Sequence, residues 1–168
     1  MTWAANSRAT YTFPVAFTAS SVTFEMLIYV TNFTGGPSIL TLTGGSGTNN
    51  IFVTGNTSTG SLGIGSGTTR STTSVLNVNT WYHLVVSYTN STTINMYING
   101  TFVSSSGGSV SNPNPYTSYI FGNYLSGNNF GIPGRIAMGR LYHRALNATE
   151  ITLNYNSVKL NGNPYGLP

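Results

Sequence analysis

Residues 81–103 read WYHLVVSYTNSTTINMYINGTFV. Apolar and polar side chains alternate along this stretch with a period of two, which is typical of β-strands that bury one face. The pattern predicts strands at 81–89 and 93–98, joined by a turn at Asn90–Ser91. The Asn99–Gly100 pair that follows is a strong hairpin signal, because both residue types tolerate the positive φ of a type I′ turn. We therefore expect an antiparallel meander over residues 80–106.

Short strands separated by Gly, Ser, Asn and Thr extend this pattern along the chain. The alternation is clearest in SVTFEMLIYV, residues 21–30, and continues in SILTLTG, NIFVTG and SLGIGSG. The region 107–133 is rich in Asn, Pro, Gly and Tyr, with one strand predicted at 117–122. Another strand begins near residue 134, and the one predicted helix follows Asn147. Asn147 is a suitable N-cap and Glu150 can reach back to it, a variant of the capping box.

The composition excludes several classes of function. Charged residues make up 5% of the 168-residue chain, which has no cysteine and a formal net charge of +4. Thiol chemistry and cysteine-based zinc sites are therefore excluded, and we predict no cofactor. The absence of any Lys/Arg run argues against a nucleic-acid partner. No apolar segment approaches the roughly 20 residues of a membrane helix, so membrane insertion is not expected either.

Three motifs together resemble a known family. The 81–103 hairpin, the closing stretch GRIAMGRLYHRALNATEI (134–151) and the strand VTFEMLIYV (22–30) are similar to the laminin-G-like jelly rolls of the concanavalin A-like lectin/glucanase superfamily. The resemblance implies an all-β fold: a two-sheet antiparallel β-sandwich with one short C-terminal helix. We expect a single domain over 1–168 with a core at about 10–156. The N-terminal arm, 1–9, and the tail, 157–168, are expected to be docking segments.

The charged cluster at 135–150 is interpreted as scaffold, because its positions recur in the family motif. The first and last motif strands of such sandwiches lie side by side, so we expect Glu25 to pair with Arg140. Arg144 and His143 would then serve the helix start or face solvent, and His83 is predicted to be a scaffold residue. The full set of predicted structural residues is Glu25, Trp81, Asn99, Gly100, Arg140, Tyr142, Arg144 and Glu150.

The same comparison argues against calcium binding and catalysis. The acidic pair of the family motif is replaced by Ala137–Met138–Gly139, and the chain has no Asp. Calcium cages need anionic oxygen ligands, so no metal site is predicted. A glycosidase needs two carboxylates that flank the scissile bond. Only Glu25 and Glu150 are available, and both have structural explanations. The sequence therefore predicts a protein that is not an enzyme.

A candidate ligand-binding region is the aromatic and amide-rich stretch 112–133. Tyrosine rings supply contact area and Asn amides supply hydrogen bonds, as in recognition loops. The alternative is that this stretch covers one edge of the sandwich, with its aromatic rings turned inward. The candidate residues are Tyr116, Tyr119, Tyr124, Asn128, Asn129 and Phe130.

Two functions remain open. The first is a virion surface component, such as a capsid decoration, vertex or fibre subunit, a role compatible with contacts to host glycans. Its partners would be other virion proteins or copies of the chain itself. If Met1 is the native start, the absence of a signal peptide fits synthesis in a host cytoplasm. The alternative is a soluble, extracellular carbohydrate-binding module that recognises glycans through its loops. Low charge favours assembly, which ranks the virion role first.

Overall fold

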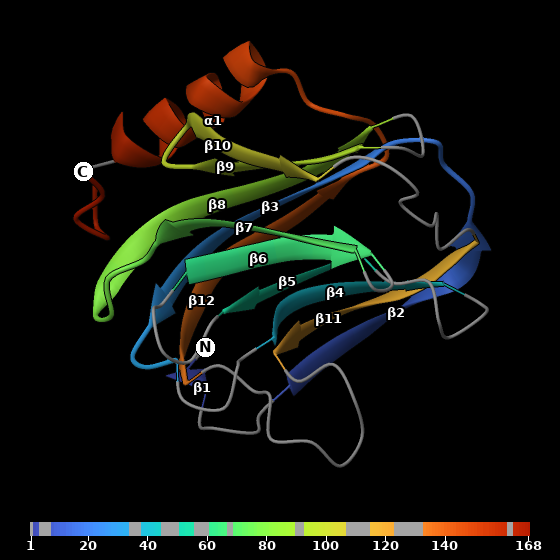
Figure 1. Ribbon diagram of the computed structural model, residues 1–168, viewed down its shortest axis with the longest axis horizontal. Helices are drawn as coiled ribbons and strands as arrows, with labels where there is room; N and C mark the ends of the chain where they lie inside the picture. The colour runs from blue at the N-terminus through green and yellow to red at the C-terminus, as the bar shows by residue number, and fades with distance from the viewer. Residues whose placement is uncertain are drawn as a thin grey trace.

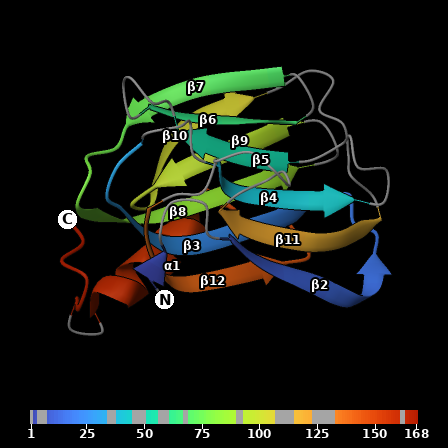
Figure 2. The same cartoon turned by 90° about the horizontal axis from the view of Figure 1, so that it is seen from below.

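The computed structural model describes residues 2–3, 8–33, 38–44, 51–55, 61–66, 69–89, 93–106, 115–122, 133–160 and 163–168. These residues form two antiparallel six-stranded sheets and one helix. Figures 1 and 2 show the two sheets packed face to face. Sheet 1 has the strand order β1-β12-β3-β8-β9-β10, and sheet 2 has the order β2-β11-β4-β5-β6-β7. The predicted β-sandwich with a C-terminal helix is confirmed.

The strands of sheet 1 include all three motif segments. Their bounds are β1 Thr2–Trp3, β3 Val22–Val30, β8 Thr80–Thr89, β9 Thr93–Ile98, β10 Thr101–Ser106 and β12 Gly134–Tyr142. The meander at 80–106 is confirmed, with φ values of 51° at Asn99 and 76° at Gly100 in its hairpin turn. The predicted turn at Asn90–Ser91 lies outside the described residues. The opening and closing strands, β3 and β12, are neighbours, as expected.

Sheet 2 contains the shorter strands. Their bounds are β2 Arg8–Phe17, β4 Ser38–Gly44, β5 Ile51–Gly55, β6 Ser61–Ser66, β7 Thr69–Val75 and β11 Tyr116–Gly122. The strand predicted at 117–122 is confirmed as β11. Strands β1, β2 and β7 were not anticipated from the sequence. Most of β2 lies in the predicted core, but its first two residues belong to the expected arm.

The main core fills the space between the sheets. Side chains at the even positions of β3, from Val22 to Val30, face sheet 2 and are almost completely buried. The odd positions of β3 are largely buried as well, because α1, residues Ala148–Leu160, covers the outer face of sheet 1 (Figure 1). Ile151 and Tyr155 are the buried residues of α1. A strand buried on both faces fixes its register firmly, since a one-residue slip would exchange its two faces.

The described part of the tail, residues 163–168, packs against its own domain. Leu167 is buried in a cluster with Leu27 and Tyr155, and the Tyr155 hydroxyl donates a hydrogen bond to the Pro168 carbonyl. The Lys159 Nζ donates to the same carbonyl at 2.7 Å. The half-buried Trp81 side chain packs against this cluster. The described part of the tail thus packs on sheet 1 of its own domain, and its docking on another molecule stays a prediction.

Candidate functional site

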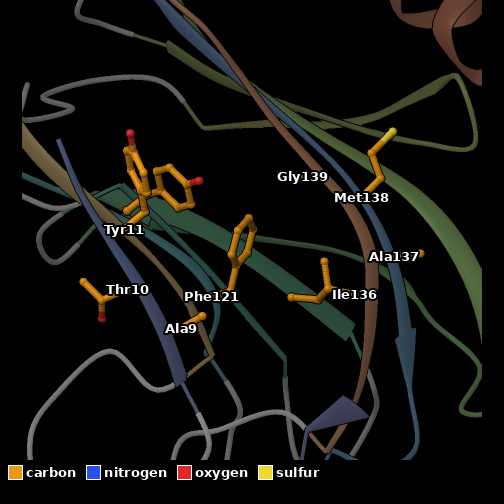
Figure 3. Close-up of a pocket in the computed structure, with 9 residues that line it drawn as sticks. Ala9, Thr10, Tyr11, Phe121, Ile136, Ala137, Met138 and Gly139 are labelled. Atoms are coloured by element: carbon orange, nitrogen blue, oxygen red, sulfur yellow. The ribbon is translucent and has the colours of Figure 1, made fainter. Parts of the chain in front are cut away.

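A groove opens where β2 and β11 of sheet 2 meet β12 of sheet 1 (Figure 3). Residues 9–11 of β2, Tyr119 and Phe121 of β11, and residues 136–139 of β12 line it. We call this hollow the edge groove. Its volume is about 360 Å³, within the range of about 300–1,000 Å³ that is usual for small-molecule sites.

Two tyrosines form an aromatic platform in the edge groove. Tyr119 of β11 pairs directly with Tyr11 of β2 across the antiparallel ladder. Residues opposite each other on two strands project to the same face, so the rings stack, with centroids 5.2 Å apart and an interplanar angle of 23°. Tyr11 is 48% exposed, whereas Tyr119 is half-buried beneath it. The platform therefore combines a supported ring with one that solvent reaches.

The Phe121 ring, which lies between β11 and β12 in Figure 3, depends on a glycine opposite it. A Cβ atom on Gly139 would lie 2.7 Å from Cζ of Phe121. Real Cβ contacts are not that short, so this position admits the ring only because it carries no side chain. Phe121 also makes an edge contact with Tyr119, with centroids 5.2 Å apart. The edge groove is thus lined by aromatic rings that contact one another.

The polar groups of the lining residues are neutral. The hydroxyls that face the groove come from Tyr11 and Tyr119, and no carboxylate or cation is among the described lining residues. Burial, and after it the neighbouring Tyr11, raises the pKa of Tyr119, so this phenol stays protonated. A protonated phenol can both donate and accept a hydrogen bond.

The residues proposed from the sequence fall in different places. Tyr119 lines the edge groove, but Tyr116 is fully buried in the main core and cannot reach a ligand. For Tyr116 the inward-facing alternative therefore replaces the expected binding role. Tyr124, Asn128, Asn129 and Phe130 lie outside the described residues. Sequence reasoning missed Tyr11 and Phe121, although RATYTFPVAF carries the alternation of a strand and could have revealed Tyr11.

A second polar cluster lies buried between sheet 1 and α1. Glu25 of β3 is fully buried and accepts hydrogen bonds from the Tyr142 hydroxyl at 2.5 Å and the Asn154 amide at 3.0 Å. The Nε2 atom of His83 lies 2.9 Å from the same carboxylate. The expected Arg140 contact is present at 3.5 Å, with a half-exposed guanidinium. The predicted pair is therefore one part of a larger set, in which closer partners come from β8, β12 and α1.

The environment of Glu25 favours its ionised form. Burial alone would raise the pKa of this carboxyl. The hydrogen bonds from His83 and Tyr142, together with the charge of Arg140, outweigh burial and hold the pKa below its usual value. Burial and the contact with Glu25 also raise the pKa of Tyr142, which keeps the phenol a donor. The cluster is a satisfied buried anion rather than a reactive one.

The helix start has the geometry predicted from the capping pattern. The Glu150 backbone N–H donates to Oδ1 of Asn147, and the Asn147 N–H donates to Oε2 of Glu150, both at 2.9 Å. The Arg144 guanidinium donates two hydrogen bonds to the Glu150 carboxylate, at 2.9 and 2.7 Å. Bonds from Arg144, and then from the Asn147 backbone, lower the pKa of Glu150 to about 2. His143 stacks on Phe17, with centroids 4.0 Å apart.

Both carboxylates of the chain are thus committed to structural contacts outside the edge groove. Among the described residues, no group of three or more His, Cys, Asp or Glu side chains could hold a metal ion. In the same part of the chain, no helix is both long enough and apolar enough to span a bilayer. The edge groove, with its exposed Tyr11 ring, is the candidate binding site.

Sequence comparison gives one match to a family model. The model is described as the concanavalin A-like lectin/glucanases superfamily, and it matches residues 4–152. No curated protein matches the chain in sequence.

Solved structures share the fold at low sequence identity. A Trypanosoma rangeli sialidase mutant displaying trans-sialidase activity aligns with a TM-score of 0.70 and 20% identity over 83% of this chain and 23% of that one. A heptameric SAP-like pentraxin from Limulus polyphemus aligns with a TM-score of 0.68 and 12% identity, over 85% of this chain and 73% of that one. A candidate carbohydrate-binding protein from Bacteroides ovatus aligns with a TM-score of 0.66 and 18% identity, over 86% of this chain and 43% of that one. The chain spans about a quarter of the sialidase length, and these identities establish the fold alone.

Proposed function

Because the chain belongs to the concanavalin A-like lectin/glucanase superfamily, we propose that it is a non-catalytic, lectin-like module that binds carbohydrate in the edge groove. The observation that carries the proposal is the stacked pair of Tyr11 and Tyr119. A sugar ring presents apolar C–H groups on its faces and hydroxyls around its rim. The exposed Tyr11 ring offers a flat apolar surface to such a face, and rigid rings order at low entropic cost.

The backbone around the edge groove supplies further hydrogen-bonding groups. Among the described strands, β2 lies at the edge of sheet 2 and pairs with β11 alone. Unpaired strand edges present N–H and C=O groups, which match the donors and acceptors of sugar hydroxyls.

The placement of the carboxylates supports binding without hydrolysis. Glycoside hydrolysis ordinarily uses two carboxyl groups that flank the bond, about 5–10 Å apart. The two glutamates of this chain are Glu25, buried under α1, and Glu150, held by Arg144 at the helix start. Neither lines the edge groove.

The test is direct binding to a panel of immobilised oligosaccharides, followed by calorimetry with the best ligand. Tyr11→Ala should weaken binding at least about tenfold, equivalent to about 1.4 kcal/mol. Phe102→Ala is a matched control, because Phe102 is a comparably exposed aromatic residue, 53% against 48%, on β10 away from the groove. Equal binding by wild type and Tyr11→Ala, or no binding to any sugar, would contradict the proposal.

A subunit on a virion surface is the second candidate. The 5% charged fraction favours it, because little repulsion opposes the assembly of many copies. Light scattering of the untagged chain over a range of concentrations tests this role. A closed oligomer would support a built-in assembly function, whereas a persistent 17.8 kDa monomer would favour the lectin-like module.

A further inference from the structure

We propose that the edge groove selects neutral glycans over acidic ones, and that a β-bulge at Ala137 produces this selectivity. The inference rests on the proposed function, because it names the class of sugar that the same groove would hold. It follows from the faces on which the two arginines of β12 lie.

The bulge is visible in the pairing of β12 with β3. Ile136 pairs with Ile28, and Met138 pairs with Leu27, the next residue along β3. Ala137 is therefore an extra residue without a partner of its own. A bulge of this kind reverses the in–out alternation of the strand that follows it.

This reversal decides where Arg140 points. Arg135 and Arg140 are five residues apart, and successive side chains of a regular strand alternate between faces. Without the bulge, the two arginines would lie on opposite faces of sheet 1. With it, both lie on the outer face, where Arg140 contacts Glu25 at 3.5 Å and the Arg135 guanidinium lies 5.5 Å from the Tyr29 ring centroid.

The inner face of β12 then presents only small or apolar groups to the edge groove. Ile136 packs against the main core, and Gly139 faces the Phe121 ring. The described lining residues offer hydroxyls but no cation to a ligand. A sugar carboxylate would lose water there without gaining a charged partner, which is costly. A neutral sugar loses less, because the tyrosine hydroxyls and the edge of β2 can satisfy its own hydroxyls.

Matched pairs of sugars test the selectivity. The probes are N-acetyllactosamine and 3′-sialyl-N-acetyllactosamine, together with neutral glucose oligomers and the same oligomers carrying a glucuronic acid residue. We expect the wild-type chain to bind the neutral member at least about tenfold more tightly in every pair that binds. Equal or tighter binding of the acidic members, still lost in Tyr11→Ala, would overturn this inference and leave the proposed function standing. If no sugar binds, or only an extended peptide does, both fail.

A charge placed at the bulge tests its role. Ala137 is exposed at the rim of the edge groove, so Ala137→Lys adds a cation beside it. We expect the preference for neutral sugars to shrink at least about tenfold, and to return at about 1 M salt, where screening acts within about 3 Å. Asn156→Lys adds the same charge on the exposed face of α1 and should leave the preference unchanged.

A second variant guards against local disruption of the bulge. Ala9→Lys adds a cation from β2, on the opposite wall of the edge groove, because Ala9 pairs with Phe121 and shares the face of β2 that carries Tyr11; it should act like Ala137→Lys. Thermal unfolding of each variant confirms that it folds. If neither groove variant changes the ratio of neutral to acidic binding relative to Asn156→Lys, the proposed origin of the selectivity is overturned.

Discussion

The Nε2 atom of His83 lies 2.9 Å from Oε1 of Glu25, and both side chains are fully buried. This contact joins β8 to β3 on the face of sheet 1 that α1 covers. Tyr142 and Asn154 extend it to β12 and to the helix itself. A buried carboxylate is tolerated only when it has hydrogen-bonding partners, and here several elements supply them. The cluster therefore ties three strands and the helix to a single anion.

Substitution of Glu25 should destabilise the fold strongly. Glu25→Gln removes the charge and turns an amide N–H₂ group toward groups that now donate to the carboxylate. Loss of one partner from a buried ionic cluster costs about 3–5 kcal/mol of unfolding free energy. Urea unfolding monitored by tryptophan fluorescence measures the change. The control is Glu150→Gln, at the partly exposed ion pair with Arg144, which should cost less. A Glu25→Gln effect no larger than that control would show that the cluster adds little stability.

The unfolding free energy should fall in acid because Glu25 and Glu150 become protonated. Both carboxyls have folded-state pKa values below the ordinary 4.5, that of Glu150 being about 2. A carboxylate with a lowered pKa stabilises the fold above its unfolded pKa, and this contribution disappears as the pH falls through the folded value. We expect the unfolding free energy to decline between about pH 5 and pH 2. In Glu150→Gln the decline should be shallower. An equally steep decline in that variant would exclude Glu150 as a source.

Two glycines with similar backbones should differ in their tolerance of alanine. Gly100 has a φ of +76° and Gly166 a φ of +60°, so alanine at either site carries the left-handed penalty of about 1–2 kcal/mol. At Gly100 the new Cβ would also lie 3.0 Å from the Tyr155 ring, whereas nothing lies within 4 Å of it at Gly166. Gly100→Ala should therefore lower the unfolding free energy more than Gly166→Ala. Equal losses would mean that Tyr155 moves aside freely.

Much of the scaffold could be predicted because its signals are local. The alternation at 80–106, the Asn99–Gly100 turn and the Asn147–Glu150 capping pattern depend on neighbouring residues, and all three are confirmed. The Glu25–Arg140 contact came from the resemblance, since strand order is not visible in a single motif. The helix begins after Asn147, as predicted, and ends at Leu160.

The candidate site was harder to predict because it depends on register. Tyr11 becomes a binding candidate only when β2 pairs with β11, and Gly139 matters only because Phe121 projects toward it. The bulge at Ala137 leaves no composition signal, since alanine fits either face of a strand. Tyr116 and Tyr119 are three residues apart with a bulge between them. Their contrasting burial follows from the three-dimensional pairing and not from residue type.

The Glu25 cluster also bears on the order in which the chain folds. Its contacts join residues separated by 58, 117 and 129 positions, reaching Asn154 within α1. Long-range contacts form late, because the chain loses the entropy of closing a large loop before the contact contributes any stabilising free energy. During synthesis, the Glu25 carboxylate can therefore be buried with all of its donors only after the last helix, which carries Asn154, has been made. A nascent chain that stops short of Asn154 should thus remain open and sensitive to proteases until the helix emerges.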